Sequence, residues 1–541
     1  MSTSTTNAAT TPPTRRRRWW MPIVAIAIPV VMFFVVRTCF QYELFPDAQM
    51  PLATAFFFSL PLALLILAIW WLFLSGFSWA TKLFGVVLAV ALPFGFTRIV
   101  RHVDFTGSMK PHFNFIWEHD PDEDVEHHFQ AIAAASTDGM PPITLAIGAT
   151  DFARYRGPKG DGVAQSGPLA QDWATLTTKE LWRQKCGGGY SGFAVAGNVA
   201  VTLEQRRQEE AVVCYDRATG KQRWQFAHPA LFKQTPNMGG NGPRSTPTIA
   251  DGDVYSLGAM GDFVCLDGAT GKPRWRVNIL KDNDAQNVMW GMTGSPLIVG
   301  GNVIVNPGVN PANNSGKAVA AYDRKTGAKV WAAGDKPAGY SSPQLAKLAG
   351  IDLILLFDGG GLVALNPENG KEEWRHEWKT FSDMNIVQPL VLSGDRVFIS
   401  SESANGGVML KLDRNRNGWV KSELWQNRNL YSRFANPVAH EGHIYGLCNG
   451  ALTCVDDKTG KRLWKDGEYG SGQLLLAGDV LIVCSEAGDI ATVAADPTGY
   501  RELGRQTVFT QKTWNTPALA GNQLFVRNHY EMACLELPAA K

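Results

Sequence analysis

Two arginines, four aromatic residues and one asparagine that lie a few positions before a proline, or before the matching strand, are the residues best suited to bind a ligand. This set is Tyr190, Arg244, Trp290, Tyr340, Asn385, Arg433 and Trp514. Two guanidinium groups and four aromatic rings that meet at one mouth would suit an anionic or peptide ligand. The alternative is that each side chain only fills space at the end of its own strand. The set therefore predicts a ligand-binding funnel, provided that the fold brings its members together.

Metal and redox chemistry have less support in the sequence. The eight cysteines form no Cys-x-x-Cys pair, which argues against zinc sites and thioredoxin-type sites. Four cysteines occur at the same place in successive repeats, which is typical of buried small side chains: Cys214, Cys265, Cys454 and Cys534. The acidic run of residues 120–126 has histidines beside it, at His119, His127 and His128. A solvated face is the interpretation we favour for this run, and a metal site is the alternative.

An internal repeat defines the elements that must position these side chains. The segment from Cys214 to Trp224, with the sequence CYDRATGKQRW, recurs from Cys265 to Trp275 as CLDGATGKPRW. Further copies end at Trp331, Trp374, Trp425 and Trp464. Repeats of about 40 to 50 residues are typical of β-propellers. We expect the Asp to cap a turn, the Gly to supply its positive φ and the Trp to open a strand that packs on the neighbouring blade.

A second marker precedes each copy and completes the blade. It is a small or polar residue followed by Pro, as in Thr246-Pro247, then an apolar strand and a Gly-Asn or Gly-Asp turn, as in Gly252-Asp253. Each unit therefore predicts four strands, which make one blade. The predicted outer-strand positions number eight: Trp182, Trp224, Trp275, Trp331, Trp374, Trp425, Trp464 and Leu503. The predicted third-strand ends also number eight: Cys214, Cys265, Ala321, Ala364, Lys411, Cys454, Val493 and Cys534.

The two ends of the repeat array predict how the ring closes. The strand that contains Trp182 has no blade before it, and the last blade reaches Leu537 without a Trp strand of its own. We expect the first strand to complete the last blade, because an open sheet edge is a liability. The predicted fold is an all-β, eight-bladed β-propeller with N-terminal transmembrane helices.

Residues 1–150 predict a membrane region and a linker. Residues 1–18 form a basic N-terminus that we expect to be disordered, and residues 19–97 contain three apolar runs that predict three membrane helices. Residues 98–150 form a juxtamembrane linker, and residues 151–541 form the propeller. Three spans with Arg15 to Arg18 in the cytoplasm would place the propeller on the periplasmic side of the inner membrane, whereas two spans would leave it in the cytoplasm. The net charge of +2 favours no nucleic-acid partner.

The Leu-Asp-x-x-Thr-Gly-Lys-x-x-Trp signature resembles the repeat of the pyrroloquinoline-quinone-like, or quinoprotein alcohol dehydrogenase-like, β-propellers. The phrases at Arg156–Gly162 and Gly242–Pro247 resemble a branch of planctomycete type whose members are BamB-like. The resemblance implies one of two functional classes. Dehydrogenases hold the quinone (PQQ) and calcium on the propeller axis, and BamB-like scaffolds bind protein partners without a cofactor. Fold alone does not choose between these classes.

Departures from the dehydrogenase pattern favour the scaffold class. The resemblance implies an adjacent Cys-Cys pair, a stacking Trp and a set of carboxylates in the enzymes. This sequence lacks the Cys-Cys pair, and only Trp290 stands where it could imitate the stacking Trp. We therefore predict no catalytic residue, metal ligand or cofactor. The expected function is a membrane-anchored interaction or assembly platform at the cell envelope, with a protein partner. A membrane-bound PQQ-dependent dehydrogenase of alcohols or sugars, with quinone and calcium, is the alternative.

Overall fold

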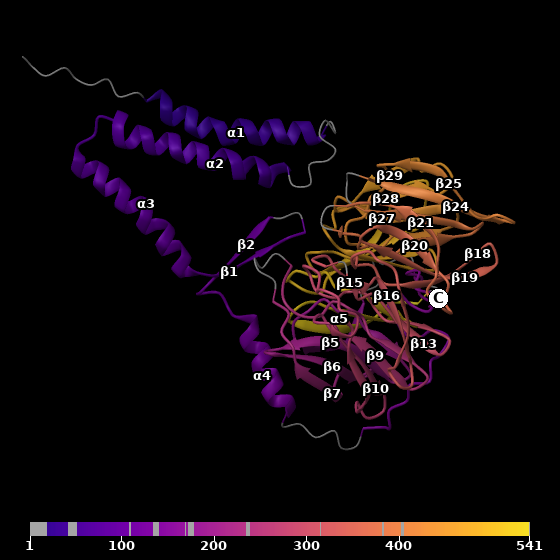
Figure 1. Cartoon of the computed structure of the whole chain (residues 1–541). Coiled ribbons are helices and arrows are strands. Elements are labelled where there is room, and N and C mark those ends of the chain that lie inside the picture. Colours follow the sequence, from indigo (N-terminus) through magenta and orange to yellow (C-terminus); the bar gives the residue numbers. More distant parts are fainter. Residues whose placement is uncertain are drawn as a thin grey trace, which may run out of the picture. The chain divides into compact units, whose positions relative to one another are not determined.

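The computed structural model describes residues 19–41, 51–107, 110–133, 140–167, 169–170, 178–233, 239–313, 315–380, 383–401 and 405–539 (Figure 1). The chain divides into two compact units. One unit comprises residues 1–103 and 113–118, and the other comprises residues 104–112 and 119–541. The predicted disorder of residues 1–18 lies outside the described residues.

The first unit contains helices over all three apolar runs: α1 (Trp20–Gln41), α2 (Pro51–Ile69) with the π-helical turn η1 (Trp70–Leu74), and α3 (Trp79–Ile99). Helices α1 and α2 pack against each other (Figure 1). Among the described residues, α3 is the one helix that is long and apolar enough to cross a bilayer by itself. A membrane region of three spans therefore stays a prediction.

Eight four-stranded antiparallel sheets form the second unit, which confirms the predicted eight-bladed propeller. Blade 1 consists of β4 (Ala194–Ala196), β5 (Val199–Arg206), β6 (Glu209–Asp216) and β7 (Gln222–Pro229), and blade 2 of β8 (Thr248–Ala250), β9 (Asp253–Leu257), β10 (Asp262–Asp267) and β11 (Pro273–Asn278). Blade 3 consists of β12 (Leu297–Val299), β13 (Asn302–Val305), β16 (Val319–Asp323) and β17 (Lys329–Ala333). Blade 4 consists of β18 (Gln344–Leu348), β19 (Ile351–Asp358), β20 (Gly361–Leu365) and β21 (Glu372–Glu377). Blade 5 consists of β22 (Leu390–Leu392), β23 (Arg396–Ser400), β24 (Gly407–Asn415) and β25 (Gly418–Asn427). Blade 6 consists of β26 (Val438–His440), β27 (His443–Cys448), β28 (Ala451–Asp456) and β29 (Arg462–Asp466). Blade 7 consists of β30 (Gln473–Ala477), β31 (Val480–Cys484), β32 (Asp489–Ala494) and β33 (Glu502–Thr507).

Blade 8 joins the two ends of the array. Its strands are β34 (Ala518–Ala520), β35 (Gln523–Arg527), β36 (Glu531–Glu536) and β3 (Lys179–Lys185). Strand β3 pairs with β36 so that Trp182 faces Cys534. The predicted closure is confirmed, and it leaves no open edge between the first and last blades.

Five of the Trp strands hydrogen-bond through the indole N–H to a turn of the next blade, at Trp182, Trp224, Trp275, Trp425 and Trp464. The indole N–H of Trp224 donates to the carbonyl of Gly268 in the turn of blade 2, at 2.9 Å. Gly271 of the same turn has φ +70°, and a Cβ there would come within 2.7 Å of the Trp224 ring. Glycine is therefore required both by the backbone conformation and by the space beside the ring. The aspartate that opens the turn, Asp267, accepts the N–H and O–H of Thr270.

Two register positions differ from the sequence expectation. All eight blades have a bulge beside the Trp position, and in blade 7 Leu503 lies in this bulge. Gly504 therefore faces Thr492 at the position where Trp faces Cys in blades 1 and 2. In blade 5 the long β24–β25 hairpin places Met409, rather than Lys411, opposite Trp425.

The residues before the prolines join the inner strands of neighbouring blades. The hydroxyl of Thr246 accepts the N–H of Gly192, the hydroxyl of Ser295 accepts the N–H of Thr246, and the hydroxyl of Ser342 accepts the N–H of Ser295. The inner strands of these blades pack side by side. The second sequence marker is therefore the joint between blades at the centre of the ring.

Three segments outside the blades also belong to the second unit. Helix α4 (Pro121–Ala133) packs against β3, and Asp124 pairs with Lys185 at 3.3 Å. The segment from Phe152 to Ala164 lies against inner strands, because Phe152 bridges to Val195 of β4 and Ala164 donates to Leu476 of β30. The tip of a hairpin formed by β1 (Val100–Phe105) and β2 (Pro111–Phe115) contacts blades 6 to 8. Shorter elements are α5 (Ile279–Asp282), β14 (Gly308–Asn310) and β15 (Ser315–Lys317).

Candidate functional site

Three of the predicted funnel residues come together where blades 8, 1 and 2 meet. The Tyr190 ring lies 5.4 Å from the Trp514 ring, and the Arg244 guanidinium lies 5.3 Å from the Tyr190 ring. Arg244 also lies 5.1 Å from the ring of Phe232. Cation–π contacts of this kind favour a fixed guanidinium beside the aromatic faces.

Arg244 is held by main-chain oxygens. It donates to the carbonyls of Gly239, Gly240 and Gly242 at 2.9–3.0 Å. Burial lowers the pKa of Arg244 to about 10, so the guanidinium remains charged at neutral pH. Arg244 therefore places a positive charge beside the rings of Tyr190 and Phe232.

The other predicted residues divide into a ring pair and a structural amide. Trp290 and Tyr340 make an edge-to-face contact at 5.4 Å, on blades 3 and 4. Asn385 is fully buried, and its amide donates to the carbonyls of Asp358 and Trp378. Asn385 thus fixes local backbone, and its own carbonyl accepts the N–H of Tyr340 at 2.8 Å.

Arg433 and Trp514 meet a segment of the chain itself. Arg433 donates to the carbonyl oxygen of Gly107 at 3.0 Å, and the N–H of Gly107 donates to the carboxylate of Glu486 at 2.5 Å. The indole of Trp514 donates to the same carboxylate at 2.9 Å. Lys512 donates to the carbonyl of Phe105 at 3.2 Å. We call Arg433, Glu486, Lys512 and Trp514 the backbone clamp.

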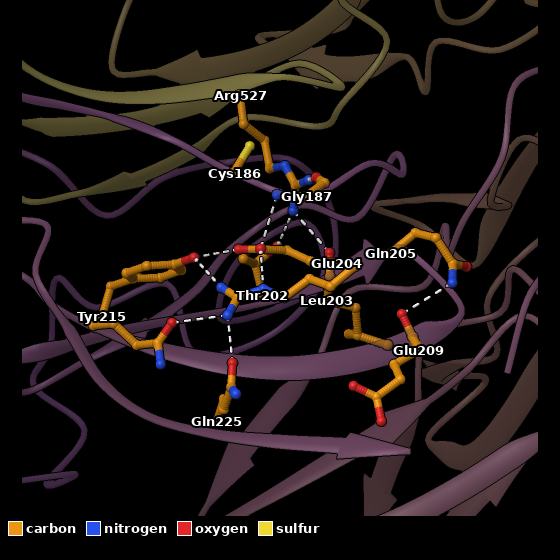
Figure 2. Close-up of polar contacts among 12 residues, drawn as sticks. Cys186, Gly187, Thr202, Leu203, Glu204, Gln205, Glu209, Tyr215, Gln225 and Arg527 are labelled. Atoms are coloured by element: carbon orange, nitrogen blue, oxygen red, sulfur yellow. Dashed lines mark hydrogen bonds and ion pairs between the residues drawn. The ribbon is translucent and has the colours of Figure 1, made fainter. Parts of the chain in front are cut away.

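A buried polar network lies beneath the loop that carries Tyr190 (Figure 2). Glu204, on β5, is completely buried and accepts the N–H of Gly187 at 2.8 Å. Arg527, at the end of β35, donates to the carbonyl of Gly187 at 2.6 Å and to the carbonyl of Leu203 at 2.7 Å. One carboxylate and one guanidinium therefore fix the loop from Cys186 to Tyr190.

Two guanidinium groups, of Arg206 and Arg527, surround the one carboxylate of this network. Burial alone would raise the pKa of Glu204, but Arg206 and then Arg527 outweigh it, so the pKa of Glu204 is lowered and the carboxylate stays ionised. Arg206 donates to Glu204 at 2.9 Å, and Tyr215 donates to the other carboxylate oxygen. Arg206 also lies 4.3 Å from the ring of Phe129 on α4. The network therefore links the loop from Cys186 to Tyr190 with α4.

A neutral histidine completes the support of this loop. Burial, and then the nearby Arg527, lowers the pKa of His529 to about 4. Its Nδ1 accepts the N–H of Gly189 at 3.1 Å, as a neutral imidazole nitrogen can. The His529 ring also lies 6.0 Å from the Tyr190 ring.

Sequence reasoning did not single out Glu204, Glu486, Lys512, Arg527 or His529. The available signal was weak: Glu204 and Arg527 are charged residues at the ends of otherwise apolar strands. Such residues usually mark the point where a strand reaches solvent.

The cysteines and the acidic run have structural roles in the described residues. The seven cysteines outside residues 1–50 are buried and unpaired. Burial raises the pKa of the Cys186 thiol to about 12, which leaves it unreactive. In the run, Asp124 contacts His119 and Lys185, and Glu126 pairs with Arg207. These acidic residues thus dock α4 on the propeller instead of only facing solvent.

Within the described residues, no three His, Cys, Asp or Glu side chains gather where they could hold a metal ion. The side-chain oxygens that lead into the inner strands serve the joints between blades, and Asn436, for example, accepts the N–H of Gln388 at 2.6 Å. Trp290 packs on Tyr340.

Comparisons with known proteins agree with this architecture. A family profile described as outer membrane protein assembly factor BamB matches residues 171–255 and 238–466. The outer membrane protein assembly factor BamB of Burkholderia pseudomallei (strain K96243) is 21% identical over 304 residues, which cover 54% of this chain and 74% of that protein.

Solved structures include relatives from both functional classes. BamB from Moraxella catarrhalis is 16% identical with a TM-score of 0.49, covering 67% of this chain and 100% of that one. The quinohemoprotein alcohol dehydrogenase from Comamonas testosteroni is 13% identical with a TM-score of 0.52, covering 77% of this chain and 85% of that one. At such identities the likeness to the dehydrogenase shows the shared fold alone. The family profile covers more than half of the chain, and on that ground the chain belongs to the family of outer membrane protein assembly factor BamB.

Proposed function

We propose that this protein is a non-catalytic propeller, anchored in the membrane, that serves as a protein-interaction or assembly platform at the cell envelope. The observation that carries the proposal is membership of the BamB family. The relative from Burkholderia pseudomallei is named as an outer membrane protein assembly factor, and an assembly factor acts by contacting other proteins.

The funnel face supports the proposal by its composition. Arg244, Tyr190 and Trp514 gather a cation and two aromatic rings, and such residues are enriched at the centres of protein interfaces. Arg433 and Lys512 add two further cations beside them. An anionic or peptide segment of a partner suits this surface.

The apolar helices support anchoring at the inner membrane. Helix α3 has the length and composition of a span, and α1 and α2 extend the apolar region. With three spans the propeller would lie on the periplasmic side. No nucleic-acid partner is proposed, given the net charge of +2.

Photo-cross-linking in intact cells tests the platform. A photoreactive residue is placed at Met289, which is 57% exposed beside Trp290, or at Val330, which is 51% exposed on the outer strand β17. We expect one defined protein adduct from position 289 and none from position 330. Equal adducts at both positions, or no adduct at either, would contradict a partner-binding funnel.

Titration with pyrroloquinoline quinone and calcium tests the dehydrogenase alternative. A ligand at 100 times its Kd adds about 2.7 kcal/mol of stability, which a thermal scan resolves. We expect no shift for the purified full chain. A clear shift that needs both quinone and calcium would restore the enzyme class.

A further inference from the structure

The backbone clamp binds main-chain atoms of its occupant through three hydrogen bonds. Glu486 accepts the N–H of Gly107, Arg433 donates to the carbonyl of Gly107, and Lys512 donates to the carbonyl of Phe105. No described side chain of the occupant takes part in these three bonds. The clamp therefore recognises main-chain groups at the turn of a hairpin rather than particular side chains.

The clamp also selects for glycine. A Cβ on Gly107 would come within 1.9 Å of the Ser471 hydroxyl and 2.5 Å of the Ser471 Cβ. It would also lie 3.4 Å from the ring of Phe434, which stacks on Trp514. A side chain at this position cannot enter without displacing the floor of the site.

The carboxylate of Glu486 is prepared for its occupant by the propeller. Its second oxygen accepts the N–H of Ser471 at 3.0 Å, and Trp514 donates to the first oxygen. Both of these donors belong to the propeller and remain when Gly107 leaves. Glu486 is thus held in a binding geometry independently of the occupant.

A comparison with Gly187 shows why this occupant can exchange. Glu204 and Arg527 hold Gly187 by the same two main-chain groups, but both side chains are at most 1% exposed. Glu486 and Arg433 are only partly buried, so water can replace the segment at the clamp. The interior pair is permanent structure, whereas the surface pair has the form of a binding site.

We infer that the backbone clamp is an interaction surface for a glycine-containing turn of a partner protein, and that residues 105–107 of the chain occupy it when the partner is absent. The inference rests on the proposed function and adds to it the chemistry of the partner segment. Covalent linkage gives the internal segment a high effective concentration, so a partner must bring further contacts to displace it.

The test uses a fluorescein-labelled peptide with the sequence of residues 104–112 and the purified full chain. The substitution Gly107→Val expels the internal segment and frees the clamp. We expect the peptide to bind this variant about tenfold or more tightly than the wild type. The same peptide with valine in place of Gly107 should not bind.

Two matched charge changes locate the binding. Added to Gly107→Val, Glu486→Gln should weaken binding by roughly tenfold or more, since it removes a charge-assisted hydrogen bond. Glu468→Gln makes the same change at an exposed position near the same blade and should leave binding unchanged. Equal peptide affinity for wild type and Gly107→Val, no binding to either, or equal effects of the two glutamine changes would overturn the inference. Adducts at Met289 that persist in Glu486→Gln would show that the platform function stands without the clamp.

Discussion

Glu204 and Arg527 hold the same residue, Gly187, by its two main-chain groups: the carboxylate accepts its N–H at 2.8 Å and the guanidinium donates to its carbonyl at 2.6 Å. The two side chains come from β5 of blade 1 and β35 of blade 8. This pair therefore fixes the Tyr190 loop and joins the first blade to the last.

Replacement of Glu204 by glutamine should destabilise the propeller strongly. The change leaves Arg206 and Arg527 without their buried counter-charge, and breaking a buried pair costs about 3–5 kcal/mol. Urea unfolding followed by tryptophan fluorescence measures the loss. Glu180→Gln is the control, because Glu180 is 42% exposed in its ion pair with Arg183 and such surface pairs contribute about 0–1 kcal/mol. Similar losses in the two variants would refute a structural role for the Glu204 network.

Glu210 should make the stability fall as the pH rises toward neutrality. Its carboxyl is 2% exposed, and burial raises its pKa to about 7 from an ordinary 4.5. Because the folded-state pKa is raised, the contribution is fully present below pH 4.5 and is lost as the pH rises through about 7. A shift of this size corresponds to about 3 kcal/mol.

Unfolding free energies at pH 5 and pH 8 test this dependence. Glu210→Gln cannot ionise, so its advantage over the wild type should appear at pH 8 and be small at pH 5. Glu209→Gln, at an exposed neighbouring position, should follow the wild type at both pH values. The same pH profile in all three proteins would exclude Glu210 as the titrating group.

Alanine at Gly271 should be more harmful than alanine at Gly252. Both glycines have positive φ, at +70° and +85°, so both changes strain the backbone by about 1–2 kcal/mol. Only at Gly271 does the added Cβ strike the Trp224 ring, and overpacking of this kind costs about 1–3 kcal/mol more. Thermal midpoints of the two variants measure the difference. Equal midpoints would mean that the ring moves aside freely.

Phenylalanine should be tolerated better at Trp331 than at Trp182. The Trp182 indole N–H donates to the carbonyl of Arg217 at 2.9 Å, whereas the Trp331 indole N–H has no hydrogen-bond partner. Both changes shrink a ring, but Trp182→Phe also leaves a carbonyl unpaired, at about 1–3 kcal/mol. Chemical denaturation of both variants compares them. A greater loss from Trp331→Phe would contradict the assigned role of the indole N–H.

The repeat made the propeller predictable, because each copy carries its own local physics. The Asp-x-x-x-Gly turn and the following Trp can be recognised without any distant residue, and the unmatched strand at Trp182 predicted the closure on blade 8. The predicted outer-strand position is wrong by one residue in blade 7, where the repeat lacks its Trp. In blade 7 Leu503 falls in the bulge that all blades share, so the paired position is Gly504, and no residue type signals it.

The site was less predictable because its contacts join residues far apart in the sequence. Gly107 and Glu486 are 379 positions apart, and neither belongs to a repeat signature. Tyr190, Arg244 and Trp514 could be proposed together since each precedes an equivalent strand. Asn385 has the same sequence position but turns inward, because the carbonyls of Asp358 and Trp378 require its amide.

The pairing of β3 with β36 determines when the propeller can complete its folding. Arg183 of β3 and Glu531 of β36, which form an ion pair in blade 8, are 348 positions apart. Contacts of such high sequence separation are slow to form, since a long loop must close before they stabilise anything. During synthesis β3 is made early, and its partner β36 becomes available only when the last blade has been made. The joint that closes the ring is therefore also its latest folding step, and until then β3 is a bare strand edge open to aggregation or to a chaperone.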